Sequence, residues 1–180
     1  MNSRDAVQMI SDVIPRTGGT WVDLGAGDGT FTRALAEQIG PNGRIYAVDH
    51  DAGAISILER WAKKSAGKVI LVRGDFTHPL DLPELGDAML DGLLFANALH
   101  FVPDPGGVLA RLATRLRPGG QVVIVEYDRR PASRWVPYPL PFERLAGLAE
   151  VAGLSAPMVA ATRPSDYGCL LYTSPSPRDS

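Results

Sequence analysis

The sequence predicts an α/β fold in which helices flank a mostly parallel sheet. Strand-like and helix-like segments alternate along the 180 residues, and parallel sheets require this alternation. The 19 glycines and 15 prolines make turns frequent and disfavour an all-helical fold. With 45% apolar and 21% charged residues, the chain has the composition of one globular domain with a sizeable core.

The first half of the chain predicts three helices and three strands. Phe31, Ala34 and Leu35 recur at helical spacing after Asp28, which is expected to cap the N-terminus of their helix. The expected helices cover residues 3–14, 30–39 and 52–66, and the expected strands cover residues 20–24, 44–49 and 68–73.

The second half continues the same alternation and adds a long loop. The expected strands cover residues 91–97, 121–127 and 158–162, and the expected helices cover residues 106–116 and 142–152. Between them, residues 128–141 form a proline-rich loop that is too long to be a mere connector.

Charge and composition argue against several classes of partner. The net charge is −2 and no block of like charges occurs, so a general nucleic-acid binder is not expected. No apolar stretch approaches the ~20 residues that span a bilayer, and the N-terminus lacks a secretory segment. A single cysteine, Cys169, excludes an intrachain disulfide, and the scattered histidines lack a carboxylate cluster for a metal. We therefore expect a cytoplasmic protein with no nucleic-acid, membrane or metal partner.

The most informative segment is the glycine-rich sequence WVDLGAGDGT at residues 21–30. It follows a predicted strand and opens a helix, so Gly25, Gly27 and Gly29 let the backbone approach a ligand next to a helix N-terminus that favours an anion. Asp49 lies 20 residues after Gly29 at the end of the next strand, where a ribose diol would sit. Thr30 departs from the dinucleotide fingerprint, which disfavours a nicotinamide oxidoreductase, and a glycine turn without a ligand is the remaining alternative.

On these residues the chain resembles the class I S-adenosylmethionine-dependent methyltransferases over residues 5–165. Residues 23–29 are similar to the cofactor motif of that family, and Gly74-Asp75-Phe76 to its adenine-binding segment. Residues 91–102 and 116–126 are similar to two later motifs, in the same order. The nearest resemblance is to small bacterial members related to quinone-biosynthesis C-methyltransferases. It implies a Rossmann-like fold, S-adenosyl-L-methionine as cofactor and methyl transfer to a small-molecule acceptor.

The resemblance and the ligand chemistry together assign roles to individual residues. Asp23 and the carbonyls near Asn97 are expected to face the cationic end of the cofactor, and Asp49 its ribose. Asp75 is expected to accept from the adenine amine and Phe76 to pack on the ring, although a turn residue and a core residue are the plain alternatives. The expected cofactor-binding residues are Asp23, Gly25, Ala26, Gly27, Gly29, Asp49, His50, Asp75, Phe76 and Asn97.

Methyl transfer from a sulfonium is an in-line displacement, so the protein mainly aligns the acceptor and excludes water. His100, just after the fourth strand, is the candidate catalytic residue, a general base; the alternative is a histidine that satisfies loop backbone beside the cofactor. Residues 97–100 (NALH) lack the signature of enzymes that methylate nucleobase amino groups. We interpret the loop with Trp135, Tyr138 and Arg130 as a lid for an apolar or aromatic acceptor bearing a negative group, with a surface connector as the alternative.

The C-terminal residues differ from the rest. Residues 169–180 (CLLYTSPSPRDS) resemble a translated sequencing-adapter read-through, and a genuine disordered tail is the alternative. We therefore expect a methyltransferase domain at residues 1–168 followed by a non-native or disordered tail, with the family's last antiparallel strand missing. A cofactor-binding domain without turnover is the alternative function. The sequence carries no signal for an oligomeric state.

Overall fold

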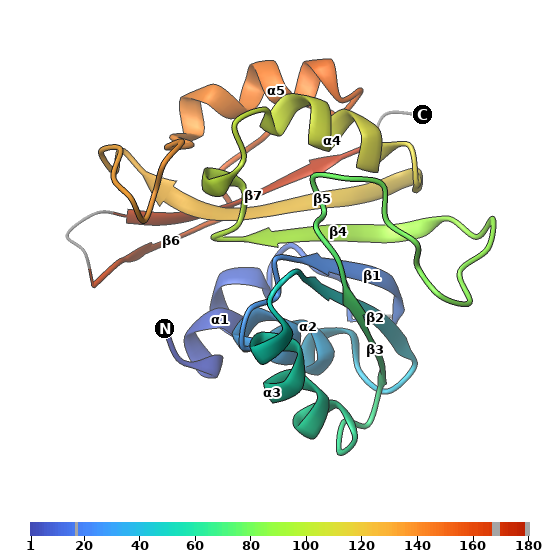
Figure 1. The fold of residues 1–180 in the computed structure, drawn as a ribbon. Coiled ribbons are helices and arrows are strands. Elements are labelled where there is room, and N and C mark those ends of the chain that lie inside the picture. Colours follow the sequence, from blue (N-terminus) through green and yellow to red (C-terminus); the bar gives the residue numbers. More distant parts are fainter. Residues whose placement is uncertain (17, 167–169, 179–180) are drawn as a thin grey trace.

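The computed structural model describes residues 1–16, 18–166 and 170–178, and they form a three-layer α/β structure around one seven-stranded sheet (Figure 1). The strand order is β3-β2-β1-β4-β5-β7-β6, with β1 to β5 parallel and β7 antiparallel to both of its neighbours. The predicted fold class is therefore confirmed. The strands are β1 (Gly19–Leu24), β2 (Gly43–Asp49), β3 (Lys68–Arg73), β4 (Leu90–Ala96), β5 (Leu116–Asp128), β6 (Ala161–Pro164) and β7 (Leu170–Pro177).

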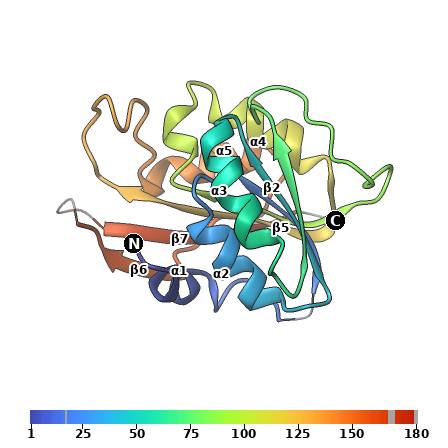
Figure 2. The ribbon, with the colours of Figure 1, turned by 60° about the horizontal axis from the view of Figure 1, so that its bottom comes forward.

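The helices cover both faces of the sheet, as Figures 1 and 2 show. One face carries α1 (Ser3–Ile10), α2 (Thr30–Ile39) and α3 (Ala52–Ala62). The other carries α4 (Pro105–Ala113) and α5 (Leu145–Val151), preceded by the 3₁₀ turns η1 (Leu99–Phe101) and η2 (Phe142–Arg144). Within the described residues, no helix has both the length and the apolar character needed to cross a membrane.

Alternate residues of each central strand enter two separate cores. In β1, Trp21 packs with α1 and α2, whereas Val22 and Leu24 pack with the α4 and α5 side. All three side chains are at most 2% exposed. Because both faces of the sheet are covered, the strands are apolar nearly throughout.

The sheet has a topological switch point between β1 and β4. From β1 the chain moves outward through β2 to β3, and it then returns to β4 on the other side of β1. In open α/β sheets such a point leaves a crevice at the carboxyl ends of the strands, which is where ligands bind. The loops after β1, β2, β3 and β4 are therefore brought to one edge.

Several element boundaries differ from the predictions. The third helix ends at Ala62 rather than residue 66, and α1 ends at Ile10 rather than residue 14. Gly29, with φ 89°, is the N-cap of α2 in place of Asp28. The Asp28 carboxylate instead accepts hydrogen bonds from the amide and hydroxyl of Thr30, which closes a local turn before the helix.

The expectation of a missing last strand is wrong. Strand β7 pairs with β5 along its whole length and lies between β5 and β6. The carbonyls of Thr173 and Pro177 accept from the amides of Ala160 and Ser155, away from β5. Because the amide and carbonyl of one residue point to the same side of an antiparallel ladder, the ring nitrogens of Pro175 and Pro177 also face away from β5. These prolines therefore cost β5 no hydrogen bond. The predicted boundary of the tail, at residues 168 and 169, lies outside the described residues.

Candidate functional site

The glycine loop after β1 is fixed by contacts that only a glycine backbone permits. The amides of Gly25 and Ala26 both donate to the carbonyl of Val48, which ties the loop to β2. Gly25 has φ 78°, and a Cβ atom there would lie 2.8 Å from the Cβ of Ala98. A side chain at position 25 would thus be strained and would also collide with the segment after β4.

Asp49, at the end of β2, holds the loop from the other side. One carboxylate oxygen accepts from the amide of Gly27 at 2.8 Å, and the other accepts from the amide of Asp51 at 2.8 Å. The residue is 8% exposed, and a carboxylate has lone pairs left after two such bonds. Next to it, the exposed imidazole of His50 lies 3.6 Å away through Nδ1.

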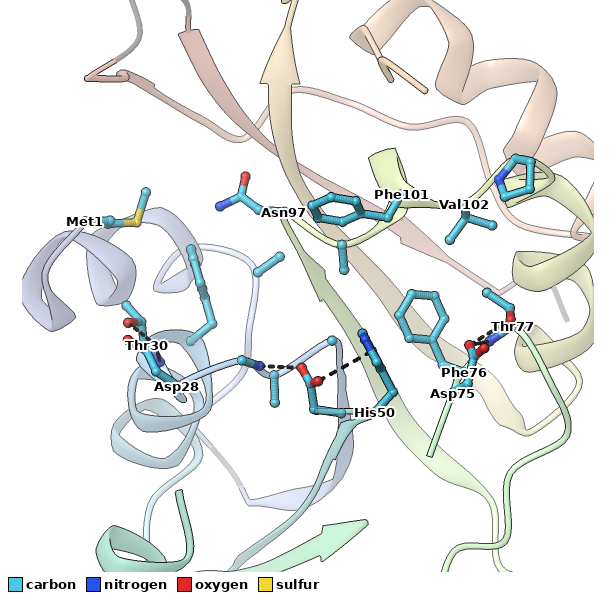
Figure 3. A pocket seen from close by; sticks show the side chains of 18 residues that line it. Met1, Asp28, Thr30, His50, Asp75, Phe76, Thr77, Asn97, Phe101 and Val102 are labelled. Carbon is cyan, nitrogen blue, oxygen red and sulfur yellow. Dashed lines mark hydrogen bonds and ion pairs between the residues drawn. The ribbon is translucent and has the colours of Figure 1, made fainter. Parts of the chain in front are cut away.

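A cavity of about 780 Å³ lies at the switch point, which is within the range of small-molecule sites (Figure 3). The ends of β1, β2, β3 and β4 all contribute to its walls, so the predicted residues come together although they are far apart in sequence. The predicted residues that line it are Gly25, Ala26, Gly27, Asp49, His50, Asp75, Phe76 and Asn97.

Two predicted residues, Asp23 and Gly29, lie outside the lining. The Asp23 carboxyl is 1% exposed, accepts from the hydroxyl of Thr32 at 2.6 Å, and has a second oxygen without a partner among the described residues. Burial raises the pKa of Asp23 to about 7. Gly29 packs so closely on Leu58 of α3 that a Cβ would overlap it. Both residues support the loop from beneath instead of facing the cavity.

In the segment after β3, Asp75 and Phe76 each line the cavity and also have the plain structural role that the sequence left open, a turn residue and a core residue. The Asp75 carboxylate accepts from the amide and hydroxyl of Thr77 and contacts His78 at 3.1 Å, and the Thr77 hydroxyl is the main cause that lowers the pKa of Asp75. This is a turn at the cavity wall. The Phe76 ring packs edge-on against Phe95 and also reaches the cavity, so it is both a core residue and a lining residue.

Other lining residues were not predicted. Thr30 and Phe31 directly follow the glycine motif, and Ala98, Phe101 and Val102 follow Asn97. Their positions next to the motifs were the available signal, because side chains beside a ligand-facing turn share its edge of the sheet. Figure 3 shows Phe101 and Asn97 side by side on one wall.

A second cavity of about 390 Å³ shares Asn97 and Phe101 with the first. Its remaining lining residues are His100, Tyr127, Arg130 and Trp135. Asn97 adopts φ 53°, and its side-chain oxygen is buried without a hydrogen-bond partner among the described residues. The two cavities therefore meet at Asn97 and Phe101.

His100 lines the second cavity, not the first, and its main partner is a side chain that sequence reasoning missed. Its Nδ1 lies 2.7 Å from Oε2 of Glu126, and its backbone amide donates to Oε1 of the same carboxylate at 3.2 Å. His100 is 3% exposed and Glu126 is 1% exposed. The available signal was a lone acidic residue at the end of the apolar run 122–125 in β5.

The loop predicted to be a lid lies over this second cavity. Figure 2 shows it at the same end of the sheet as the N-terminus. The amide of Tyr138 donates to the carbonyl of His100 at 2.9 Å, and Val136 is buried, so the loop is anchored to η1 and the core. Trp135 remains 63% exposed, and the guanidinium of Arg130 stacks over the Tyr127 ring at 4.6 Å.

The profile of the family described as "Methyltransferase domain" matches residues 22–124, which is more than half of the chain. The chain belongs to this methyltransferase family. Membership confirms the resemblance to class I S-adenosylmethionine-dependent methyltransferases, and with it the prediction of S-adenosylmethionine as cofactor.

Curated relatives of two kinds match the chain. A demethylmenaquinone methyltransferase from Bacillus licheniformis is 33% identical over 123 residues, which cover 68% of this chain and 50% of the relative. A ribosomal RNA small subunit methyltransferase H from Magnetococcus marinus is 33% identical over 88 residues, which cover 48% of this chain and 28% of the relative. The matched residues thus span half or less of the length of each of these two relatives.

Solved methyltransferase structures share the fold. The 1,6-didemethyltoxoflavin-N1-methyltransferase of Burkholderia thailandensis, with bound 1,6-didemethyltoxoflavin and S-adenosylhomocysteine, superimposes with a TM-score of 0.77 at 23% identity. That match covers 99% of this chain and 78% of that one. An S-adenosylmethionine-dependent methyltransferase from Aquifex aeolicus gives a TM-score of 0.72 at 18% identity, over 95% of this chain and 89% of that one.

Proposed function

We propose that this chain transfers the methyl group of S-adenosylmethionine to a small-molecule acceptor held in the second cavity. The observation that carries the proposal is the shared wall at Asn97 and Phe101, where the glycine-loop cavity meets the one under the lid. A donor and an acceptor on either side of this wall would be aligned without further rearrangement. When bound, S-adenosylmethionine supplies a methyl group that is already activated on a sulfonium.

The residues of the first cavity fit this cofactor. Asp49 offers a carboxylate for the ribose hydroxyls while it holds the loop, and the loop itself opens α2, whose N-terminus favours the cofactor's carboxylate. Asn97 lines the cavity at the end of β4, where its backbone carbonyl would suit the cationic end. Asp75 and Phe76 lie on the wall where the adenine would bind.

The residues of the second cavity suit an aromatic acceptor. Phe101, Tyr127 and Trp135 supply ring faces, and Arg130 supplies a positive charge for an anionic group. His100 is the general base, with Nε2 as the ring nitrogen not engaged by Glu126. The loop with Trp135 forms the outer wall of this cavity.

The names of the relatives support a small acceptor without fixing it. A quinone methyltransferase and a toxoflavin methyltransferase act on flat ring systems by their names, in accord with the aromatic walls. The prediction of no nucleic-acid partner is not supported, because ribosomal RNA methyltransferases are also among the relatives. RNA is therefore included in the test.

Calorimetry with S-adenosylmethionine, S-adenosylhomocysteine and NADH tests the cofactor, and turnover on a panel of phenols, quinones, carboxylates and ribosomal RNA tests the acceptor. We expect both sulfur compounds to bind and a ring compound to be methylated. Tight NADH binding without a response to the sulfonium would contradict the proposal. Binding of the sulfonium without turnover on any acceptor would favour a cofactor-binding domain that does not catalyse.

A further inference from the structure

A buried carboxylate lies behind His100, and the proposed reaction does not by itself require it. Glu126 is 1% exposed at the carboxyl end of β5; its Oε1 accepts from the backbone amide of His100, and its Oε2 lies 2.7 Å from Nδ1 of the same residue. Burying a carboxylate is costly unless it is paired and hydrogen-bonded. The backbone amide can only donate, so Oε1 is an acceptor, and an ionised carboxylate would accept at Oε2 as well.

The surroundings of the pair restrict where protons sit. On β7, Tyr172 lies opposite Glu126, donates its hydroxyl to the carbonyl of Leu140, and is kept neutral because burial raises its pKa. On the cavity side, Tyr127 and Arg130 are the other ionisable groups beside the imidazole. No hydrogen bond joins Nε2 of His100 to any residue that the structure describes. The second ring nitrogen is therefore left to the cavity.

We propose that Glu126 is a positioning residue that keeps the proton of neutral His100 on Nδ1, so that Nε2 presents a lone pair to the second cavity. This inference rests on the proposed function, and it narrows the acceptor class. Such a base removes a proton from a neutral group, so the acceptor carries a weakly acidic hydroxyl or ring N–H on a flat ring. A tertiary amine or thioether acceptor has no proton to give and would not need the pair.

The proton transfer balances within the residues described. The O–H or N–H bond of the acceptor breaks, the proton forms a bond with Nε2, and the electron pair stays on the oxygen or nitrogen that then attacks the methyl carbon. The methyl–sulfur bond breaks and its electron pair stays on sulfur. The carboxylate of Glu126 then faces an imidazolium, so the net charge of the buried pair of Glu126 and His100 changes from −1 to zero. The carboxylate stabilises the imidazolium without taking its proton.

Glu126→Gln separates this role from simple support of the turn. The amide has nearly the same shape, and its carbonyl can still accept from the backbone amide of His100. Its NH₂ group then faces Nδ1 and donates to it, which moves the imidazole proton to Nε2. The variant is therefore expected to fold with the wrong tautomer. Glu150→Gln, on the exposed side of α5, is the matched control.

Long-range ¹H–¹⁵N correlation spectra of the histidine rings report the tautomer directly, with the protein loaded with S-adenosylhomocysteine. The His100 signals are those lost in His100→Asn. We expect protonated Nδ1 in the wild type and in Glu150→Gln, and protonated Nε2 in Glu126→Gln. A wild-type ring protonated on Nε2, or a tautomer unchanged by Glu126→Gln, would overturn the assignment of Glu126.

A chromophoric phenol tests the acceptor class without turnover. Para-nitrophenol added below its own pKa to the loaded wild type is expected to show the absorption band of the phenolate, and Glu126→Gln is expected to lose it. Absence of the band at saturating phenol overturns the claim that Nε2 of His100 takes a proton from an acidic group in the second cavity. Calorimetry of S-adenosylhomocysteine on the same samples separates these failures from a failure of the proposed function, since only the latter abolishes cofactor binding.

Discussion

The two cavities are built in different ways. The walls of the first come from short segments that each follow a parallel strand, and its key contacts are backbone amides at Gly25, Ala26 and Gly27. The second is made by side chains from the segment after β4, the end of β5 and the loop that follows it, among them His100, Tyr127 and Trp135. A site formed by backbone is set by the fold, whereas a site formed by side chains can change while the fold is kept. In the function proposed above, the first cavity carries the chemistry shared by the family and the second carries the acceptor choice of this chain.

The largest expected effect concerns catalysis on the second side. His100→Ala removes the proposed base, so turnover should fall about 10²- to 10⁴-fold. The first cavity does not contain this side chain, so the affinity for S-adenosylhomocysteine should stay as in the wild type. Steady-state kinetics with the acceptor found in the panel and calorimetry on the same sample check both expectations. Full turnover by His100→Ala would remove the general base from the account.

The next effect concerns the backbone of the first cavity. Gly25→Ala places a Cβ 2.8 Å from the Cβ of Ala98, which has no rotamer to move away, at φ 78°. Left-handed strain costs about 1–2 kcal/mol and overpacking about 1–3 kcal/mol more. Gly153→Ala, at φ 65° with nothing within 4 Å, carries the strain alone. Thermal melts should therefore show the larger loss for Gly25→Ala, and only that variant should lose cofactor affinity. Equal losses would contradict the close approach.

A smaller effect is expected at the end of β2. Asp49→Ala removes a carboxylate that holds the amide of Gly27 and faces the proposed ribose site. A hydrogen bond to a charged group contributes about 1.5–3 kcal/mol, so calorimetry should show affinity for S-adenosylhomocysteine weakened about 10- to 100-fold. Asp87→Ala removes the same charge from an exposed position outside the cavity and should leave the affinity intact. Unchanged affinity in Asp49→Ala would refute its assignment to the ribose.

The last effect depends on pH and concerns Asp23 beneath the loop. Its pKa is raised from 3.8 to about 7 by burial, so the folded state binds this proton more tightly than the unfolded chain. The stabilising effect of the bound proton is complete below pH 4 and is lost as the pH rises through about 7. Asp23→Asn should therefore raise Tm by several degrees above neutral pH and change it little in acid. A Tm difference that does not depend on pH would contradict the buried position of the carboxyl.

Eight of the ten residues that the sequence marked for a cofactor line the first cavity, because their signals are local. The glycine motif directly follows a strand, and the acidic residue ends the next strand. Because neighbouring strands are parallel, their carboxyl ends meet at one edge of the sheet, which brings the two segments together. The order of strands and helices followed from the same periodicity. Asp23 was misplaced because the pattern of β1 does not distinguish a carboxyl above the loop from one below it.

The sequence did not predict the second cavity or the last strand, because both are formed by tertiary contacts. The partnership of Glu126 with His100 joins residues 26 positions apart on different elements, and no spacing rule predicts it. Proline disfavours a central strand, yet Pro175 and Pro177 both face the side of β7 that does not pair with β5. Pairing direction, which decides whether a proline is tolerated, is a property of the assembled sheet.

A crystal structure with S-adenosylhomocysteine tests the central claim most directly. The account predicts that the ligand lies along the glycine loop, with its ribose hydroxyls on the carboxylate of Asp49 and its sulfur toward the wall formed by Asn97 and Phe101. Density for the ligand in any other place, or with its sulfur turned away from the second cavity, would contradict the proposed transfer between the two cavities.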